Sequence, residues 1–300
     1  MTPSNPLPYD IDLTRLEAQL PSDWQLHYFA EIESTNDWAL ARYRVQAPTR
    51  PAFILARLQS RGRGRADRIW QAAAGNLTCS LAFPLASSTG IAGVESQAMQ
   101  LAWPARLAIA TALAVWETAR DFLPAQRCQI KWPNDLLVDG HKAAGILIES
   151  CIGSELGTAT PRVQTIIVGI GINVNANPAP EQASTSLQRG ITPISFAAAS
   201  GSQFDLTNVI ATLATHLNDR LTAIGSIGTS ASTASSNWND MSMLAEFNQQ
   251  LAWKERLVSV RQGGEEIEGL LLGVETNGHL LISTSHGVRL FAAGELRPIQ

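Results

Sequence analysis

The chain has 300 residues, of which 45% are hydrophobic and 16% are charged, and its formal net charge at pH 7 is −4. This length suits one large domain plus a small one, and the composition excludes global disorder. The slightly acidic balance argues against a dedicated nucleic-acid binder, because such proteins usually carry a basic domain.

The cysteines and histidines exclude several kinds of site. Cys79, Cys128 and Cys151 are far apart and form no CxxC pair, which argues against a disulfide framework or a thiolate metal site and is typical of a reducing cytoplasm. The histidines are scattered without an HExxH pattern, so we expect no zinc held by the protein. The N-terminus lacks the regions of a signal peptide, and no run of about 18 apolar residues predicts a membrane span. We therefore expect a cytoplasmic protein with no membrane partner.

Short helices and strands alternate through the first part of the chain. In chain order we expect a short helix at 12–19, a strand at 25–32, a helix from about 34, strands at 52–59 and 76–84, and a helix at 104–122. Ser34 or Thr35 would cap the second helix, with Asp37 in its first turn.

Strands then dominate up to about residue 175. From 128 the pattern reads strand, proline break, strand, an Asp139-Gly140 turn and a long strand, and 163–175 predicts another buried strand. Residues 176–204 are expected to be mostly loop, and 206–223 to be an amphipathic helix.

The last quarter of the chain differs in composition. Residues 225–240 are rich in Ser, Thr, Gly and Ala and predict a flexible linker, with a short helix near 241–252. From 256 onward, glycine-containing turns at 263–264, 277–278 and 286–287 separate short strands, which predicts a small β-barrel of about 45 residues.

The stretch RGRGRADRIW, residues 61–70, concentrates arginines between two predicted strands. Guanidinium groups match phosphate and carboxylate geometry, and glycine lets the backbone approach a ligand closely. A loop closing over an anionic ligand is one interpretation, and a solvated basic turn is another. An RGG-type RNA segment is a third, although such segments occupy long low-complexity tracts. Gln59, just before the loop, can bind an amide or a urea.

KWPND, residues 131–135, places Lys131 at a strand end beside a rigid Trp132-Pro133 step. A fixed ammonium there can stabilise a phosphate or a developing negative oxygen, whereas the alternative is a surface lysine. Asn134 and Asp135 can cap a turn or bind a hydrated Mg²⁺.

Two further motifs have both a structural and a functional interpretation. ESTN, residues 33–36, can cap a helix or hold a polar ligand head at the positive helix end. GIGIN, residues 169–173, lacks the GxGxxG spacing of a dinucleotide site. It is either a strand end that needs bare backbone or a place where Asn173 reads a base edge.

The order of these motifs is more specific than any one of them. ESTN, the QSRGRGR segment with Trp70 and Gly75-Asn76-Leu77, KWPNDLLVDGHKAAGILIE, GIGINVN, Thr185-Ser186-Leu187 and a small C-terminal β unit together resemble the biotin–protein ligase family over residues 25–300. The resemblance implies an α+β fold, a mixed β-sheet flanked by helices, with a small C-terminal SH3-like barrel. We expect a catalytic domain at 1–240, including the 225–240 linker, and the barrel at 252–300.

The resemblance also implies an activity. Family members make biotinyl-5′-AMP from biotin and Mg·ATP and transfer biotin to a lysine of a biotin carboxyl carrier protein, usually that of acetyl-CoA carboxylase. No metal is expected to be held by the protein alone, since Mg²⁺ comes with ATP. A homodimer is possible, and we expect no nucleic-acid partner. About 25 residues precede the matching pattern, so the N-terminal DNA-binding domain of some relatives, and a repressor role, are not expected.

Matching the family motifs residue by residue implies roles for eleven side chains or backbone positions. The biotin ureido head would be held by Ser34, Thr35, Asn36 and Gln59. The loop that closes over biotin and the adenylate phosphate would contribute Arg63, Gly64 and Arg65, with both arginines in catalytic roles together with Lys131 at the carboxyl and phosphate oxygens. The adenylate would be bound by Trp70, Asn173 and Lys142.

The loop departs from the common GRGRRGR family pattern at Ala66-Asp67, which lowers its charge. Two other functions remain open at this point. One is a lipoate–protein ligase, which has a related fold and the same adenylation chemistry. The other is a non-catalytic RNA binder that uses the arginine loop, which the acidic balance disfavours.

Overall fold

A computed structural model describes residues 10–66, 68–71, 73–84, 97–153, 162–178, 191–225 and 240–299. Residues 226–239 of the predicted linker and the Thr185-Ser186-Leu187 motif lie outside the described residues. The helices are α1 (Leu13–Gln19), α2 (Thr35–Tyr43), α3 (Gln97–Phe122), α5 (Phe196–Ser200), α6 (Leu206–Ala223) and α7 (Asp240–Gln250), with a 3-10 turn, η1, at Ala125–Arg127.

Twelve strands are assigned in the described residues, and they form two sheets. The first contains β1 (Gln25–Phe29), β2 (Ala52–Ala56), β3 (Leu77–Pro84), β4 (Cys128–Lys131), β5 (Asp135–Val138), β6 (His141–Gly153) and β7 (Arg162–Ile172). The second contains β8 (Leu257–Gln262), β9 (Glu265–Val274), β10 (Leu280–Thr284), β11 (Gly287–Phe291) and β12 (Glu295–Pro298).

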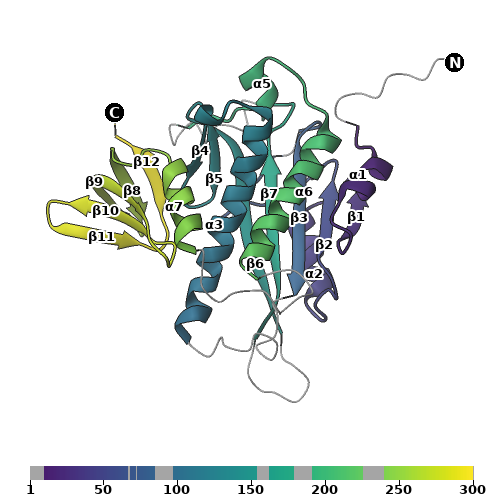
Figure 1. Ribbon diagram of the computed structural model, residues 1–300, viewed down its shortest axis with the longest axis horizontal. Helices are drawn as coiled ribbons and strands as arrows, with labels where there is room; N and C mark the ends of the chain where they lie inside the picture. The colour runs from purple at the N-terminus through teal and green to yellow at the C-terminus, as the bar shows by residue number, and fades with distance from the viewer. Residues whose placement is uncertain are drawn as a thin grey trace.

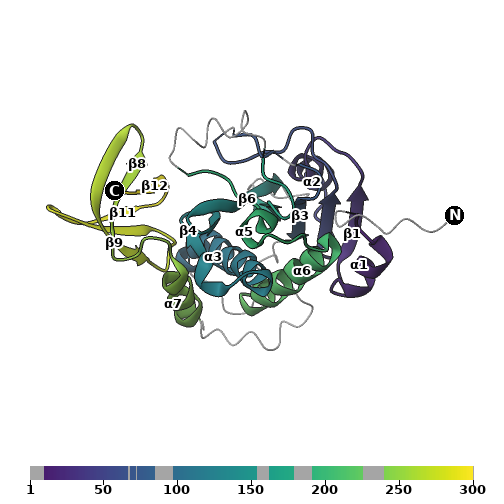
Figure 2. The ribbon, with the colours of Figure 1, turned by 90° about the horizontal axis from the view of Figure 1, so that it is seen from above.

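The large sheet has the strand order β1-β2-β3-β7-β6-β5-β4. Strands β1 and β2 pair in parallel and the other neighbours are antiparallel. The two views of the ribbon show α3 and α6 side by side on one face and α2 on the opposite face (Figures 1 and 2). The predicted fold class, a mixed sheet flanked by helices, is confirmed.

The alternation of side chains along β3 explains how the sheet serves both layers. Leu77, Cys79, Leu81 and Phe83 belong to the main core, which also contains the buried residues of α3 and α6. Ala82 belongs to a second, smaller core under α2. Successive side chains of a strand point to opposite faces, so the polar Ser80 and Thr78 share the α2 face with Ala82.

Helix predictions were good where the apolar periodicity was long. Helix α6 has the predicted bounds, and Asp205 caps it by accepting a hydrogen bond from the Asn208 N–H. Helix α3 begins at Gln97, seven residues before the predicted start, and continues through Pro104. The prediction used this proline as a start signal, but a proline near the N-terminus of a long helix removes only one backbone hydrogen bond.

The predicted loop at 176–204 also contains a helix. One turn, α5, is capped by Ser195, which accepts from the Ala198 N–H, and ends at Gly201 with φ +77°. A segment this short has no apolar periodicity, so only its cap residues signal it.

The C-terminal strands form one antiparallel sheet in the order β11-β10-β9-β8-β12. Glycines at the predicted turns, Gly263, Gly264, Gly278 and Gly287, have positive φ, as such turns require. Strands β11 and β12 stand at the two edges, and no pairing among the described residues closes the sheet into a barrel. The small β unit is therefore confirmed as an antiparallel sheet, which agrees with an SH3-like unit.

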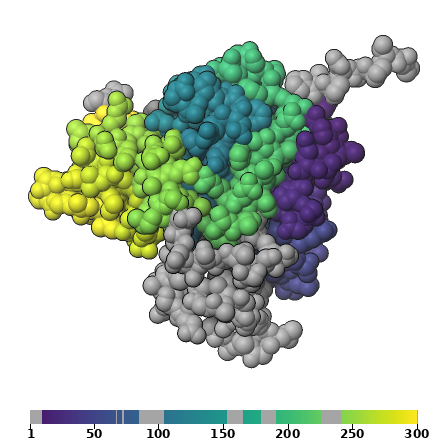
Figure 3. Space-filling view, in the orientation of Figure 1, coloured from purple at the N-terminus to yellow at the C-terminus, as the bar shows by residue number. Residues whose placement is uncertain are grey.

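This second sheet forms a lobe beside the main body (Figure 3). The Trp132 Nε1–H donates to the Gly278 carbonyl at 3.0 Å, and the Ala252 N–H donates to the Ile130 carbonyl at 2.8 Å. Buried residues of both sheets belong to one continuous core. The predicted boundaries at 240 and 252 stay predictions.

The three cysteines are buried free thiols. Burial raises the pKa of Cys128 to about 11 and also raises the pKa of Cys79 and Cys151, so all three are poor nucleophiles. In the described part of the chain, the helices are too short or too polar to cross a membrane.

Candidate active site

A cavity of about 520 Å³ opens on the α2 face of the large sheet and reaches the C-terminal sheet. All of the predicted site residues line it: Ser34, Thr35, Asn36, Gln59, Arg63, Gly64, Arg65, Trp70, Lys131, Lys142 and Asn173. They come from segments spread over about 140 positions of the chain, and the sheet register brings them together.

The N-terminus of α2 forms the neutral polar end of the cavity. Ser34 is the N-cap and accepts from the Asp37 N–H, while Thr35 donates its N–H to Gln59 Oε1 at 2.7 Å. The Thr35 hydroxyl lies 3.0 Å from the same oxygen and 2.7 Å from Ser80 Oγ. These hydroxyl and amide groups are therefore held in place before any ligand binds.

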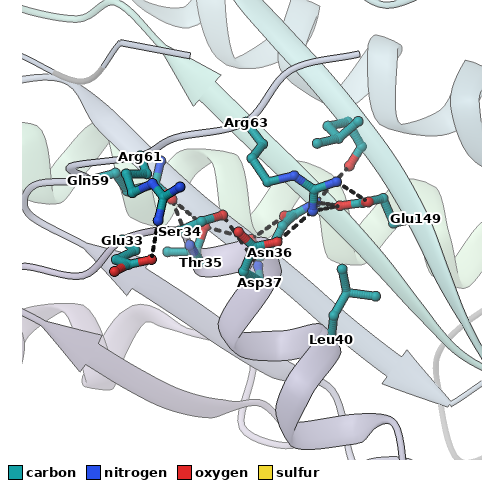
Figure 4. A network of polar contacts seen from close by, with 12 residues as sticks. Glu33, Ser34, Thr35, Asn36, Asp37, Leu40, Gln59, Arg61, Arg63 and Glu149 are labelled. Carbon is teal, nitrogen blue, oxygen red and sulfur yellow. Dashed lines mark hydrogen bonds and ion pairs between the residues drawn. The ribbon is translucent and has the colours of Figure 1, made fainter. Parts of the chain in front are cut away.

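Arg63 lies next to this end and is held by two carboxylates (Figure 4). Its guanidinium contacts Glu149 at 2.9 and 3.2 Å and Asp37 at 2.6 Å. Burial alone would lower the pKa of Arg63, but the hydrogen bonds and charges of Asp37 and Glu149 outweigh burial and raise it. Both sides of the guanidinium fork are thus occupied by protein groups.

The arginine loop forms a tight hairpin. Gly64 donates its N–H to the Arg68 carbonyl at 2.7 Å, and Trp70 donates to the Gly62 carbonyl at 2.8 Å. A Cβ at Gly62 would overlap the Trp70 carbonyl oxygen, so the backbones can approach this closely only with glycine there.

The far side of the hairpin reaches the cationic end of the cavity. Arg65 donates to Asn134 Oδ1 at 3.2 Å, and burial lowers the pKa of Arg65. Arg68 pairs with Glu295 at 3.6 Å, so the C-terminal sheet also borders the cavity.

Three glycines form a bare floor between the two ends. Gly145 and Gly171 face each other across β6 and β7, and Gly169 lies one step along β7. A Cβ at Gly169 would lie 2.9 Å from Asn36 Cγ, and one at Gly171 would lie 2.5 Å from Trp70 Cζ2 and closer still to Cε2 and Nε1. The GIGIN motif is therefore a strand that must carry no side chain where Asn36 and Trp70 pack on it.

Two lysines share one buried carboxylate at the cationic end. The Asp135 carboxylate is 2.6 Å from Lys142 Nζ and 3.6 Å from Lys131 Nζ. Burial lowers the pKa of Lys131, and the charge of Asp135 compensates only in part. Burial would raise the pKa of Asp135, but the two lysines outweigh it and the pKa is lowered. The sequence contains three lysines, and two of them stand here.

The two lysines differ in how far they reach into the cavity. The Lys131 side chain is 9% exposed, whereas that of Lys142 is 28% exposed. Lys142 Nζ also lies 5.7 Å from the centre of the Trp70 ring, within the range of a cation–π contact. Lys142 is therefore the more accessible ammonium for an anionic ligand.

Asn173 is 1% exposed, and its amide faces protein groups. Its Nδ2 lies 3.3 Å from the Ile194 carbonyl and 3.5 Å from the Lys142 carbonyl. The structure thus shows Asn173 joining β7 to the segment before α5. Its predicted contact with adenine stays a prediction.

Several residues at the site were not among the predicted set. Ser80, Glu149 and Glu295 line or support the cavity, and Asp135 was weighed only as a turn cap or a Mg²⁺ ligand. Ser80 is a polar residue within the apolar strand segment LTCSLAFP, which is a usable signal. Glu149 and Glu295 gave no local signal, because their partners are distant in sequence.

Comparison with known proteins was made at this point. The model of the Biotin/lipoate A/B protein ligase family matches residues 28–173. A biotin--[acetyl-CoA-carboxylase] ligase of Paracoccus denitrificans is 31% identical over 275 residues, which is 89% of this chain and 98% of the relative. One of Mycobacterium tuberculosis is 34% identical over 131 residues, 43% of this chain and 46% of the relative.

Among solved structures, the biotin protein ligase from Aquifex aeolicus in complex with biotin and ATP has a TM-score of 0.64 at 22% identity, covering 92% of this chain and 99% of that one. The fold and the family match define the class: the chain belongs to the Biotin/lipoate A/B protein ligase family. Within this family it is an enzyme of the biotin protein ligase kind, as the motifs predicted.

Proposed function

We propose that this cavity makes biotinyl-5′-AMP from biotin and Mg·ATP, and that the enzyme transfers the biotinyl group to one lysine of the biotin carboxyl carrier protein of acetyl-CoA carboxylase. The observation that carries the proposal is the polarity of the cavity. One end presents neutral hydroxyl and amide groups, the other presents ammonium and guanidinium groups, and a glycine floor joins them. Biotin has a neutral urea at one end and a carboxylate at the other.

The neutral end has the donors and acceptors that a cyclic urea needs. Among the described residues, the Ser34 hydroxyl proton and Gln59 Nε2 have no protein partner, so both can donate to the urea carbonyl. Thr35 Oγ1 and Asn36 Oδ1 retain lone pairs for the two urea N–H groups. Buried polar groups that match a ligand reject analogues that leave them unpaired.

The cationic end suits the chemistry of activation. The biotin carboxylate attacks the α-phosphorus of ATP and displaces pyrophosphate, so negative charge must be stabilised on the phosphoryl oxygens. Lys142, Lys131 and Arg65 supply positive charge there, and Trp70 offers a ring face for the adenine. The described residues contain no group of three or more His, Cys, Asp or Glu side chains that could hold a metal, so Mg²⁺ is expected to arrive with ATP.

In the transfer step, the amine of the carrier lysine attacks the acyl carbon of biotinyl-5′-AMP. An amide forms, the acyl–phosphate bond breaks and AMP leaves with the electron pair, while the amine loses a proton to solvent or to a basic group. The printed names of the curated relatives support acetyl-CoA carboxylase as the source of the carrier.

The test is incubation with biotin, Mg·ATP and a biotin carboxyl carrier domain, followed by the mass of the intact acceptor. One biotinyl group on one lysine, dependent on ATP, is expected, and a carrier with that lysine changed to arginine is the control. Lipoate replaces biotin in a parallel reaction. Transfer of lipoate but not biotin would refute the proposal.

The two lysines can be separated by substitution. We expect Lys131→Ala and Lys142→Ala each to lower pyrophosphate release about 100-fold or more, the usual effect of removing one donor to a developing anion, while biotin still binds. Lys254, which pairs with Glu255 away from the cavity, is the matched control. Normal turnover of either variant would remove that lysine from the reaction.

A further inference from the structure

Glu149 lies on β6, on the same face of the sheet as Gly145, and has no role in the predicted site. Its carboxylate is two-pronged in its contacts: Arg63 occupies both oxygens, and Oε2 also accepts a hydrogen bond of 2.8 Å from Asn36 Nδ2 (Figure 4). It is the carboxylate that meets the α2 N-terminal segment through a side chain already assigned to biotin.

A carboxylate paired with arginine can only accept hydrogen bonds. Asn36 must therefore turn its Nδ2 toward Glu149, and the second Nδ2 hydrogen faces the Leu147 carbonyl at 3.4 Å. With both N–H groups directed at acceptors, Oδ1 of Asn36 is left on the opposite side of the amide. The orientation of this buried amide is thus dictated from outside the cavity.

The direction continues through Ser80. Its Oγ is 2.5 Å from Asn36 Oδ1, and since an amide oxygen cannot donate, the one Ser80 proton goes to it. Ser80 Oγ then faces Thr35 Oγ1, at 2.7 Å, as an acceptor. The Thr35 proton is thereby directed to Ser80 or to Gln59 Oε1, and the lone pairs of Thr35 Oγ1 remain for a ligand.

We propose that Glu149 is a positioning residue that sets the donor and acceptor direction of the chain Asn36–Ser80–Thr35, so that acceptor atoms face the urea N–H groups of biotin. The inference deepens the proposed function and rests on it for the identity of the ligand. If Asn36 turned over, Nδ2 would replace Oδ1 at Ser80, the hydroxyl directions would reverse, and a donor would face each urea N–H.

A simpler role must be separated from this one. Glu149 also anchors Arg63 and with it the loop, but Asp37 shares that task at 2.6 Å without touching Asn36. Replacing Glu149 by glutamine or by leucine removes the charge on Arg63 equally. Only leucine also removes the acceptor from Asn36, so the difference between the two variants measures the effect on the amide.

The experiment measures biotin affinity by isothermal titration without ATP, and kcat for pyrophosphate release at saturating biotin. We expect Glu149→Leu to weaken biotin binding by about 10-fold or more, the effect of losing a hydrogen bond to a charged group. Glu149→Gln should weaken it by about 3-fold, because an amide oxygen still accepts from Asn36. In both, kcat should stay within about twofold of wild type, since the change acts on ligand binding.

Glu33→Gln is the matched control, because it removes a carboxylate that pairs with Arg61 of the same loop and is remote from Asn36. It should bind biotin as wild type does. Equal affinities of Glu149→Gln and Glu149→Leu, whatever their size, would overturn the inference, as would a loss confined to kcat.

Thermal unfolding checks that each variant is folded. If Glu149→Leu does not fold, Glu149→Gln is compared with Asp37→Asn, which removes a carboxylate from Arg63 without touching Asn36; equal losses would overturn the inference. Wild-type protein that binds no biotin would instead refute the proposed function, so the two failures are distinguishable.

Discussion

Gly171 offers a direct test of the bare floor, because its neighbours leave no room for a methyl group. A Cβ there would lie 2.5 Å from Trp70 Cζ2, well inside the 3.5–4.0 Å of an ordinary carbon contact. The strand cannot retreat, since Gly171 is paired with Thr78 of β3 on one side and Gly145 of β6 on the other. We therefore expect Gly171→Ala to displace the Trp70 indole.

Overpacking of this kind costs about 1–3 kcal/mol, and displacement of Trp70 moves the arginine hairpin because its N–H is bonded to Gly62. We expect Gly171→Ala to stay folded, to lose about that much stability in urea unfolding, and to lose pyrophosphate release at least about tenfold. Trp70→Ala removes the overlap, so Gly171→Ala should have almost no added effect in that background.

The assay is a double-mutant cycle of the wild type, the two single variants and the double variant, each measured for stability and for pyrophosphate release. Strong non-additivity is the expected result for groups in contact. If the two effects simply add, the indole does not rest on Gly171 and the argument for the bare floor is wrong.

The remaining predictions concern the loop and the buried ion pair. Arg65→Gly should release biotinyl-5′-AMP, seen as labelling of an added lysine-rich bystander protein, whereas Arg61→Gly, an exposed arginine of the same loop, should not; bystander labelling at the wild-type level by Arg65→Gly would exclude Arg65 from retention. Asp135→Asn should cost about 3 kcal/mol or more in urea unfolding at pH 7, because it leaves Lys131 buried without a counter-charge. Asp139→Asn, at the half-exposed pair with Arg127, should cost at most about 1 kcal/mol. Because the pKa of Asp135 is lowered on folding, its stabilisation is present above the unfolded value of about 3.9 and is lost as pH falls through the folded pKa; a gap between the two Asp135 forms that persists in stronger acid would contradict this.

Local patterns were sufficient for much of the site. Lys131, the arginine loop and the ESTN segment were identified because each joins a chemical type to a nearby structural signal, such as a strand end, a glycine pair or a helix start. The same patterns located α6 and the C-terminal turns, since apolar periodicity and positive-φ glycines act within a few residues.

The tertiary structure alone decided which of these groups meet and what they do to one another. Asn36 faces Glu149 across 113 positions of the chain, Arg68 faces Glu295, and Trp70 covers Gly171. Each contact depends on the register between strands that are far apart in sequence, and a register is set by the packing of the whole sheet rather than by any one strand. The physical reason is that a side chain's type is local, while the charge, burial and hydrogen-bond direction acting on it come from neighbours that only folding supplies.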